Sequence, residues 1–335
     1  MKSCLSIDKG FGYTKIAIVE DGKLKPPTKE IDTVAYLQGY TKEDFEKSNG
    51  DVVYHDDKYY MVGSNALQAV KSYDHIIDSL DYSGFRNVSA FVIKKHWKNN
   101  GGKFSNLVVS LSPAYADYSA DYKEYIAKEL EMAPEKVLVI PQGAGAKIAL
   151  ENVGLNPNTP TSGDMFRNYL LFDIGFNTID VVHVVNGVSP AGNRDGHPGW
   201  GVVRVAEKLR EHLKSEFGMN LTMAHMRNII SLGQYTMHGK VYQMEDRIKK
   251  FTGEYITEVV KFIRENYQVV VNEIDNVFFV GGGAELLKDN KEFLLSEFAK
   301  KFSRASEDFF RIPEDGSEYY NAIGGAYYGY KSLKG

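Results

Sequence analysis

The sequence predicts an α/β protein built from two related halves, and a repeated strand–turn–strand pattern is the main reason. Residues 168–187 begin with an apolar run that ends at Asp173, and a second β-rich run follows a glycine turn. Residues 3–22 repeat this pattern without a gap, with Asp8 in the position of Asp173. Both copies end in a dipeptide, Asp-Gly or Asn-Gly, of the kind that closes a hairpin. Internal self-similarity outweighs any single motif, so we expect a duplicated fold.

A second pair of segments supports the duplication. Residues 140–150 and 320–330 share a Gly-Ala step on a helical pattern of small residues. The chain has 335 residues, and at roughly 150 residues per domain about two domains are expected. We predict a first half at 1–165, a second half at 166–317, and a C-terminal helix at 318–335 that packs back on the first half.

The first half is expected to begin with strands at 3–9 and 13–20, followed by a polar connection with two prolines at 24–32. The irregular, tyrosine-rich stretch 33–100 is predicted to be a small inserted subdomain, with a hairpin at 51–63. The half then continues with strand, helix, strand and helix at 106–113, 117–132, 136–140 and 142–150.

The second half follows a linker at 151–168 that is rich in Gly, Pro, Asn, Thr and Ser. After its hairpin, 191–201 is expected to be a turn-rich loop in which His197 is a turn residue. Residues 193–273 are predicted to be the second inserted subdomain. It would hold helices at 202–217, 222–231 and 242–273, the last with one buried apolar stripe.

Composition excludes several classes of protein. The net charge is −4, so no overall basic field attracts nucleic acid. Cys4 is the only cysteine, which excludes a disulfide framework or a cysteine zinc site within one chain and fits a reducing compartment. The first residues lead directly into a strand, and no apolar run is long enough to span a bilayer. We therefore expect a cytoplasmic protein with no direct nucleic-acid partner and no membrane partner.

The two turns suggest phosphate and Mg²⁺ chemistry. Glycines let backbone N–H groups approach anionic oxygens, and a carboxylate at a strand end can hold a hydrated Mg²⁺. One Asp-x-Gly turn would be weak evidence, because such turns are common. Asp8 and Asp173 stand in matched copies, and two such turns facing each other would clamp a polyphosphate from both sides.

Three further features are open to two interpretations each. Lys15 lies on a strand face that meets either solvent or phosphate. Gln142 either caps a helix or orients an attacking water, as glutamines do in other nucleotide hydrolases. The glycine run 281–283 either forms a tight strand-to-helix turn or packs on a flat ligand. The chain has neither a P-loop nor a G-x-G-x-x-G dinucleotide fingerprint.

These segments resemble, in order, the motifs of the superfamily that contains actin, hexokinase and the heat-shock chaperone ATPases. SIDKGFGYTKIAI resembles its first phosphate motif, LLFDIGFNTIDVV its second, NVFFVGGGAEL its adenosine motif, and the two small-residue helices its connecting motifs. The resemblance implies duplicated ribonuclease H-like domains around a central nucleotide cleft, each with an inserted subdomain. Within the superfamily, the length and GGGAEL are most similar to the ParM-type plasmid-segregation actins and the archaeal actin-like proteins.

The resemblance also implies roles for individual residues. Asp8 and Asp173 would hold Mg²⁺ through water, and Asp8, Asp173 and Gln142 would form the catalytic group, with Asp173 and Gln142 positioning the hydrolytic water. ATP or GTP would be the nucleotide. The implied nucleotide-binding residues are Gly10, Phe11, Gly12, Tyr13, Lys15, Gly175, Phe176, Asn177, Thr178, Glu207, Lys208, Gly281, Gly282, Gly283 and Glu285. Glu207, Lys208 and Arg210 are candidates for ribose and adenine contacts only because of their place in the second inserted subdomain, where the sequences of the superfamily vary.

Membership of a superfamily does not define a function. The preferred interpretation is a filament-forming actin-like ATPase that is used in DNA segregation or cell organisation. Its partners would be further copies of itself and a DNA-binding adaptor protein. The alternatives are a small-metabolite kinase and a non-polymerising regulatory or chaperone ATPase on the same fold. A kinase usually adds a catalytic aspartate that deprotonates its substrate, and no candidate in a matching loop is evident.

Overall fold

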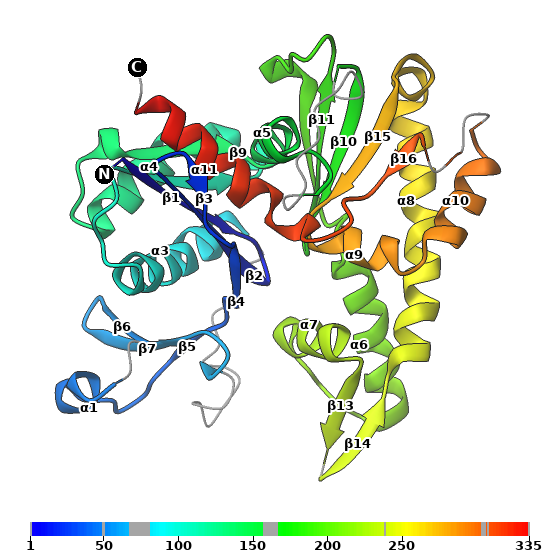
Figure 1. Cartoon of the computed structure of the whole chain (residues 1–335). Helices are drawn as coiled ribbons and strands as arrows, with labels where there is room; N and C mark the ends of the chain where they lie inside the picture. Colours follow the sequence, from blue (N-terminus) through cyan, green and yellow to red (C-terminus); the bar gives the residue numbers. More distant parts are fainter. Residues whose placement is uncertain are drawn as a thin grey trace. The chain divides into compact units, whose positions relative to one another are not determined.

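The structure is a computed structural model that describes residues 2–48, 51–66, 81–156, 167–237, 239–302, 306 and 308–333 (Figure 1). The chain forms two compact units. The first contains Met1–Asn152 and Tyr319–Gly335, and the second contains Val153–Glu318. The units divide at 152–153, within the segment that the sequence identifies as a linker. None of the described helices is long and apolar enough to cross a bilayer.

The first unit is organised around a sheet of six strands in the order β3-β2-β1-β8-β9, with β4 also paired to β2. β1 runs antiparallel to β2 and parallel to β8. All residues of β1 and β8 are buried, as expected for central strands. The strands are β1 (Ser3–Lys9), β2 (Tyr13–Glu20), β3 (Lys23–Leu24), β4 (Thr28–Ile31), β8 (Asn106–Leu111) and β9 (Val137–Pro141).

The expectation that 24–32 is only a connection is wrong, because β4 and the last residue of β3 lie within it. β4 pairs with β2 from Tyr13↔Ile31 to Ile16↔Thr28. Pro26 and Pro27 lie between the two short strands, at the edge of the sheet, where proline is tolerated because no ladder hydrogen bond is lost.

Helices α4 (Ser119–Glu129), α5 (Ala144–Val153) and α11 (Tyr320–Ser332) complete the layers of this unit. α11 packs on β1, β2 and β8. α5 and α11 cross in close contact, because a Cβ at Gly324 would lie 1.7 Å from the carbonyl oxygen of Gly145. The small residues that the repeated helical pattern contains are therefore required for this crossing.

The insertion of the first unit is a sheet of three strands in the order β5-β7-β6. Asp56 and Asp57 form the predicted hairpin turn, and both have positive φ. Helix α3 packs on this sheet through Val88, Phe91 and Val92, and it also contacts β1 and α4. The elements are β5 (Val34–Tyr36), α1 (Lys42–Glu46), β6 (Val52–His55), β7 (Lys58–Val62) and α3 (Tyr82–Asn99).

The second unit repeats the central arrangement of the first. Its sheet has the order β12-β11-β10-β15-β16, with β10 antiparallel to β11 and parallel to β15. Asp8 pairs with Lys15 in one ladder, and Asp173 pairs with Asp180 at the same point of the other. The strands are β10 (Tyr169–Ile174), β11 (Thr178–Val184), β12 (Arg194–Pro198), β15 (Asn276–Val280) and β16 (Phe310–Arg311).

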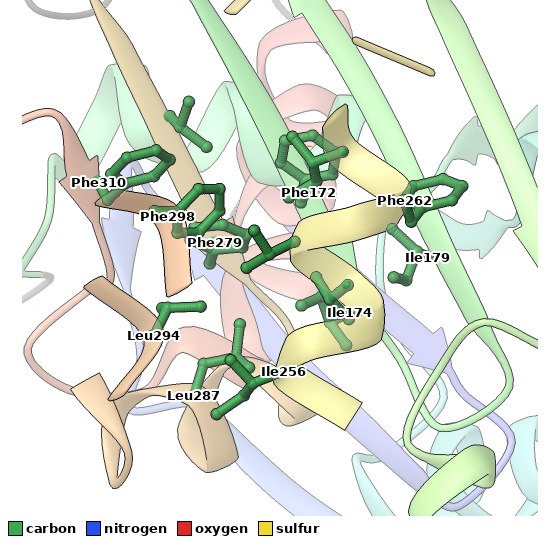
Figure 2. Packing of buried hydrophobic residues seen from close by; sticks show 14 of the residues in the cluster. Phe172, Ile174, Ile179, Ile256, Phe262, Phe279, Leu287, Leu294, Phe298 and Phe310 are labelled. Atoms are coloured by element: carbon green, nitrogen blue, oxygen red, sulfur yellow. The ribbon is translucent and has the colours of Figure 1, made fainter. Parts of the chain in front are cut away.

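The core of the second unit lies between this sheet and α8 (Glu245–Glu273), α9 (Gly282–Lys288) and α10 (Lys291–Ala299). Figure 2 shows that the strands and the helices each contribute aromatic and aliphatic side chains to this core, for example Phe279 and Ile174 from the strands and Phe298 and Leu294 from α10. The Phe298 and Phe310 rings stack with centroids 3.8 Å apart, and Phe172 and Phe279 stack at 5.6 Å. This core fixes the ends of β10 and β15, where the candidate site begins.

The insertion of the second unit is narrower than the predicted range 193–273. A separate apolar cluster joins α6 (Val203–Phe217), α7 (Met223–Leu232), the hairpin of β13 (Gln234–Met237) and β14 (Lys240–Gln243), and the beginning of α8. β12 instead pairs with β11 in the main sheet, and the end of α8 packs in the main core. The predicted range was too wide for two reasons. β12 contains Gly and Pro and lacks the apolar alternation of a strand. The apolar stripe of α8 continues without a break from one core to the other.

Candidate functional site

The first turn connects β1 to β2 and leaves two successive N–H groups available. The N–H of Gly10 donates to the carbonyl of Tyr13 over 3.1 Å, and the carbonyl of Gly12 accepts from the N–H of Asp32. Among the described residues, the N–H groups of Phe11 and Gly12 donate to no protein acceptor. N–H groups in this arrangement are suited to bind an anion.

The second turn, between β10 and β11, has the same geometry. The N–H of Gly175 donates to the carbonyl of Thr178 over 2.9 Å, and the N–H groups of Phe176 and Asn177 donate to no acceptor within the described ranges. The carbonyls of 175–177 are all bound by the segment 199–203 that leads into α6. The duplication therefore extends from the sequence to the hydrogen bonding of both turns.

Asp8 is the second-last residue of β1, beside the first turn, and is almost fully buried. Its Oδ1 accepts a hydrogen bond of 2.9 Å from Nε2 of Gln142, and its Oδ2 lies 3.9 Å from Nζ of Lys15. The Lys15 side chain is only 13% exposed, and its Nζ would be 3.1 Å from a Cβ at Gly10. Lys15 therefore lies over the turn, with its side chain mostly shielded from solvent.

Asp173 occupies the same place in the second unit but has a different partner. It faces Asp180 across the β10–β11 ladder, and both carboxylates are buried. Like charges directly opposite each other in a sheet destabilise it. Thr178 offsets part of this cost by donating its hydroxyl to Asp180 over 3.3 Å. The carboxylate of Asp173, near the end of a buried strand and beside the second turn, is of the kind that Mg²⁺ takes in proteins, so the residues of this turn fit a hydrated metal ion.

The glycine run that follows β15 has two different roles. A Cβ at Gly281 would lie 2.3 Å from Oδ1 of Asp173, and one at Gly283 would lie 2.3 Å from Cγ2 of Ile174. Gly281 also has a φ of 87°, in the left-handed region. These two glycines are needed for a tight turn against β10. Gly282 has no atom within 4 Å of its Cβ position, so it alone leaves backbone open to a ligand.

Glu285 lies in the first turn of α9 and is bound to Ser317. The Ser317 hydroxyl donates to Oε1 of Glu285 over 2.7 Å, and Oε2 of Glu285 lies 3.9 Å from Nζ of Lys288. The carbonyl of Ser317 accepts from the N–H of Gly281. Ser317 thus joins Glu285 to the glycine run, and no motif in the sequence indicated this serine.

The three residues chosen on α6 have different surroundings. Glu207 is exposed and Arg210 is half-buried. Nζ of Lys208 lies 2.9 Å from both Glu254 and Glu258 of α8. Burial alone would lower the pKa of Lys208, but the hydrogen bonds that Lys208 donates to the two carboxylates outweigh it and raise the pKa. Lys208 is therefore charged and paired within its own unit.

The segment 199–203 is the main feature that sequence reasoning missed. His197, expected in a loop, lies in β12, and its Nε2 is 2.8 Å from the Tyr267 hydroxyl. Gly201 fits only because it lacks a side chain, since a Cβ there would be 2.5 Å from the carbonyl oxygen of Phe176. The glycine-rich GHPGWG was the only signal in the sequence that could have indicated such a close approach.

Comparisons with known proteins concern the fold of the chain. The family model described as Archaeal actin homologue MreB-like, C-terminal, matches residues 171–292. No curated protein sequence matches the chain. The structure is similar to that of Ta0583, an archaeal actin homologue, with 17% identity, a TM-score of 0.67 and 99% of each chain covered.

Two further solved structures have similar scores. A 15-stranded ParM filament from Clostridium botulinum gives 15% identity and a TM-score of 0.65, with 98% of this chain and 99% of that chain covered. MreB5 of Spiroplasma citri bound to ADP gives 13% identity and a TM-score of 0.68, with 100% and 98% covered. The fold that the sequence motifs predicted is confirmed: the chain has the duplicated, ribonuclease H-like actin fold, and residues 171–292 of its second unit match the family model for the C-terminal part of MreB-like archaeal actin homologues.

Proposed function

We propose that this protein is an actin-like ATPase that binds a purine nucleoside triphosphate with Mg²⁺, hydrolyses it and assembles into filaments. The observation that supports this most strongly is the matched pair of turns. Each has two successive N–H groups without a protein acceptor in the described part of the chain, and each follows a buried aspartate, Asp8 or Asp173. Two copies of this arrangement in one chain are suited to a polyphosphate.

The metal would be held through water by Asp8 and Asp173. Mg²⁺ in proteins takes one or two carboxylates, keeps several waters and fills its other positions with substrate phosphate. The described residues contain no group of three acidic, His or Cys side chains that could hold a metal alone, so phosphate and water would supply the remaining ligands. Bound Mg²⁺ neutralises charge that develops on the phosphoryl oxygens.

Gln142 would orient the attacking water, with Asp173 as the second group that positions it. The Nε2 atom of Gln142 is bound to Asp8, which leaves its Oε1 as an acceptor for water. A glutamine is not a strong base, and its contribution is orientation, as in other nucleotide hydrolases. Lys15, close to Asp8 over the first turn, would balance negative charge on the phosphates.

The nucleoside would lie against the backbone at Gly282, with Glu285 and the exposed Glu207 as candidates for polar contacts. Gly282 supports this because its Cβ position is open.

Two observations on other proteins agree with a nucleotide and a polymer: MreB5 was solved with ADP, and ParM was solved as a filament. The phosphate turns would contact the phosphates and not the base, so the proposal includes both ATP and GTP.

The partner in the polymer would be a second copy of the chain. We infer a role in DNA segregation or cell organisation, with a DNA-binding adaptor protein connecting the filament to its cargo. We place this activity in the cytoplasm as part of the proposal, because a chain with a single cysteine, Cys4, cannot form a disulfide within itself and is suited to a reducing compartment.

The test is high-speed sedimentation of the purified protein with MgATP, with MgADP and without nucleotide, while phosphate release is followed in the same samples. The proposal predicts that the protein pellets with MgATP and releases phosphate. Phosphate release that starts only after a sugar or small acid is added, without pelleting, would identify a kinase. Hydrolysis without pelleting at any concentration would favour a regulatory ATPase.

A further inference from the structure

The second turn is hydrogen-bonded to the short segment 199–203, and two side chains hold this segment in place. Four N–H groups of the segment 199–203 donate to the three carbonyls of the turn. Val202 donates to Gly175 over 3.1 Å and Val203 to Phe176 over 2.6 Å, while the N–H groups of residues 199 and 201 both donate to Asn177, over 2.8 and 3.1 Å.

These bonds determine the direction of the two available N–H groups. A trans peptide is planar, so its C=O and N–H point in opposite directions. The carbonyl of Gly175 shares a peptide with the N–H of Phe176, and the carbonyl of Phe176 shares one with the N–H of Asn177. Because Val202 and Val203 hold these carbonyls, they also orient the N–H groups that a phosphate would accept from.

The segment is in turn held by two side chains. Nε of Arg204 donates to the carbonyl of Gly199 over 2.9 Å, and the hydroxyl of Tyr255 donates to the carbonyl of Trp200 over 3.0 Å. The guanidinium of Arg204 also lies 3.9 Å from the centre of the Trp200 ring. The peptide between residues 200 and 201 therefore accepts from Tyr255 at one end and donates to Asn177 at the other.

Both side chains are themselves fixed. Tyr255 belongs to α8 and is completely buried. Nη1 of Arg204 donates to Glu258 over 2.8 Å, and Glu258 also accepts from Lys208. Burial would raise the pKa of Glu258, but these two cations outweigh it and lower the pKa, so the carboxylate stays ionised. An unbroken series of bonds thus leads from α8 to the turn.

We propose that Arg204 and Tyr255 are positioning residues that hold the second turn in its anion-binding form, by fixing the segment 199–203 to α8. This inference rests on the proposed function for its ligand, the phosphates of MgATP. The hydrogen bonds of the ligand-free protein provide a test that does not depend on nucleotide.

The experiment compares Arg204→Lys and Tyr255→Phe with the control Arg247→Lys. Arg247 also bridges α8 and α6, through His212 and Glu216, but it makes no contact with the segment. Amide hydrogen exchange of residues 199–203 is measured without nucleotide. Loss of one hydrogen bond should speed this exchange about tenfold in Arg204→Lys and Tyr255→Phe, but not in the control. Exchange equal to that of the wild type would overturn the inference.

The Kd for MgATP is then measured for the same four proteins. We expect the Kd to rise about tenfold in the two variants, because the N–H groups of the turn would then form weaker hydrogen bonds to the charged phosphate. In the control, the Kd should change less than twofold. Faster exchange with an unchanged Kd would overturn the inference, because holding the turn in place would then contribute nothing to phosphate binding. A wild type that binds no MgATP would instead refute the proposed function, while the exchange data would still decide whether the two residues hold the turn.

Discussion

The side-chain amide of Gln142 donates a hydrogen bond to Oδ1 of Asp8 over 2.9 Å. Gln142 lies two residues before α5, and Asp8 is the second-last residue of β1, so this bond joins the segment that leads into α5 to the strand that leads into the first turn. It orients the amide and leaves one carbonyl oxygen for a water. The same bond holds the carboxylate that would face the metal, so two of the proposed functional groups are positioned together.

Gln142→Ala should therefore slow hydrolysis without removing nucleotide binding. Loss of one preorganised group typically costs about 10²–10³ in rate, whereas the turn and Lys15 remain. Single-turnover phosphate release and the Kd for MgATP are measured on the same preparation. A Kd raised as much as the rate is lowered would mean that Gln142 binds substrate and does not orient water.

Asp173→Asn should abolish hydrolysis while nucleotide still binds. The amide keeps the shape that packs against Gly281 but cannot hold Mg²⁺ as a carboxylate does. Calorimetry of ATP binding with and without a chelator provides the measurement. The wild type should bind more weakly with chelator, and the variant should respond much less. Steady-state hydrolysis at the wild-type rate in a folded variant would refute the role of Asp173.

Gly281→Ala and Gly282→Ala form a matched pair. At Gly281 a methyl group would meet Asp173 at 2.3 Å on a backbone with positive φ, and the combined strain and overpacking should cost on the order of 3 kcal/mol of unfolding free energy. At Gly282 the methyl group meets nothing within 4 Å. Thermal unfolding should separate the two variants clearly. Gly282→Ala should melt like the wild type and bind ATP more weakly; unchanged ATP affinity would remove the nucleoside from this backbone.

The sequence was sufficient to predict the two turns because their signals are local. Each consists of an apolar strand, an aspartate and a glycine within a few residues. Because the pattern occurs twice, each copy supports the assignment of the other. Strand pairing and the small-residue crossing of α5 and α11 followed from the same patterns. What the sequence could not provide was the partner of each polar group.

Those partners come from parts of the chain that are distant in sequence. Lys208 pairs with two glutamates more than forty residues away, and Ser317 reaches Glu285 from the segment before α11. The sequence predicts a loop at β12, because its pairing with β11, and not its composition, makes it a strand. The extent of the second insertion was wrong for the same reason, since only packing separates the two ends of α8.

His96 should make stability depend on pH below neutrality. Burial lowers its pKa from 6.5 to about 4, with Lys95 adding to the shift and Glu30 opposing it. The unfolded chain then binds a proton that the folded chain does not bind between these two pH values, so the unfolding free energy rises with pH from 4 to 6.5. At about 1.36 kcal/mol per pKa unit, the full effect is on the order of 3 kcal/mol.

Urea unfolding of the wild type and of His96→Gln at pH 7 and pH 4.5 checks this effect. The variant keeps a polar group near Glu30, which lies 3.2 Å from His96, but has no group that titrates in this range. The wild type should lose more stability than the variant on acidification. Equal losses in both proteins would mean that His96 does not contribute to the pH dependence.

The most direct test of the account is a light-scattering time course with a limited supply of MgATP, for the wild type beside Gln142→Ala. If nucleotide binding drives assembly and hydrolysis reverses it, wild-type scattering should rise on addition of ATP and fall once the ATP is consumed. The Gln142→Ala trace should rise equally and persist longer. Traces that decay together, while the variant hydrolyses more slowly, would contradict the link between hydrolysis and disassembly, and no rise at any protein concentration would contradict the filament itself.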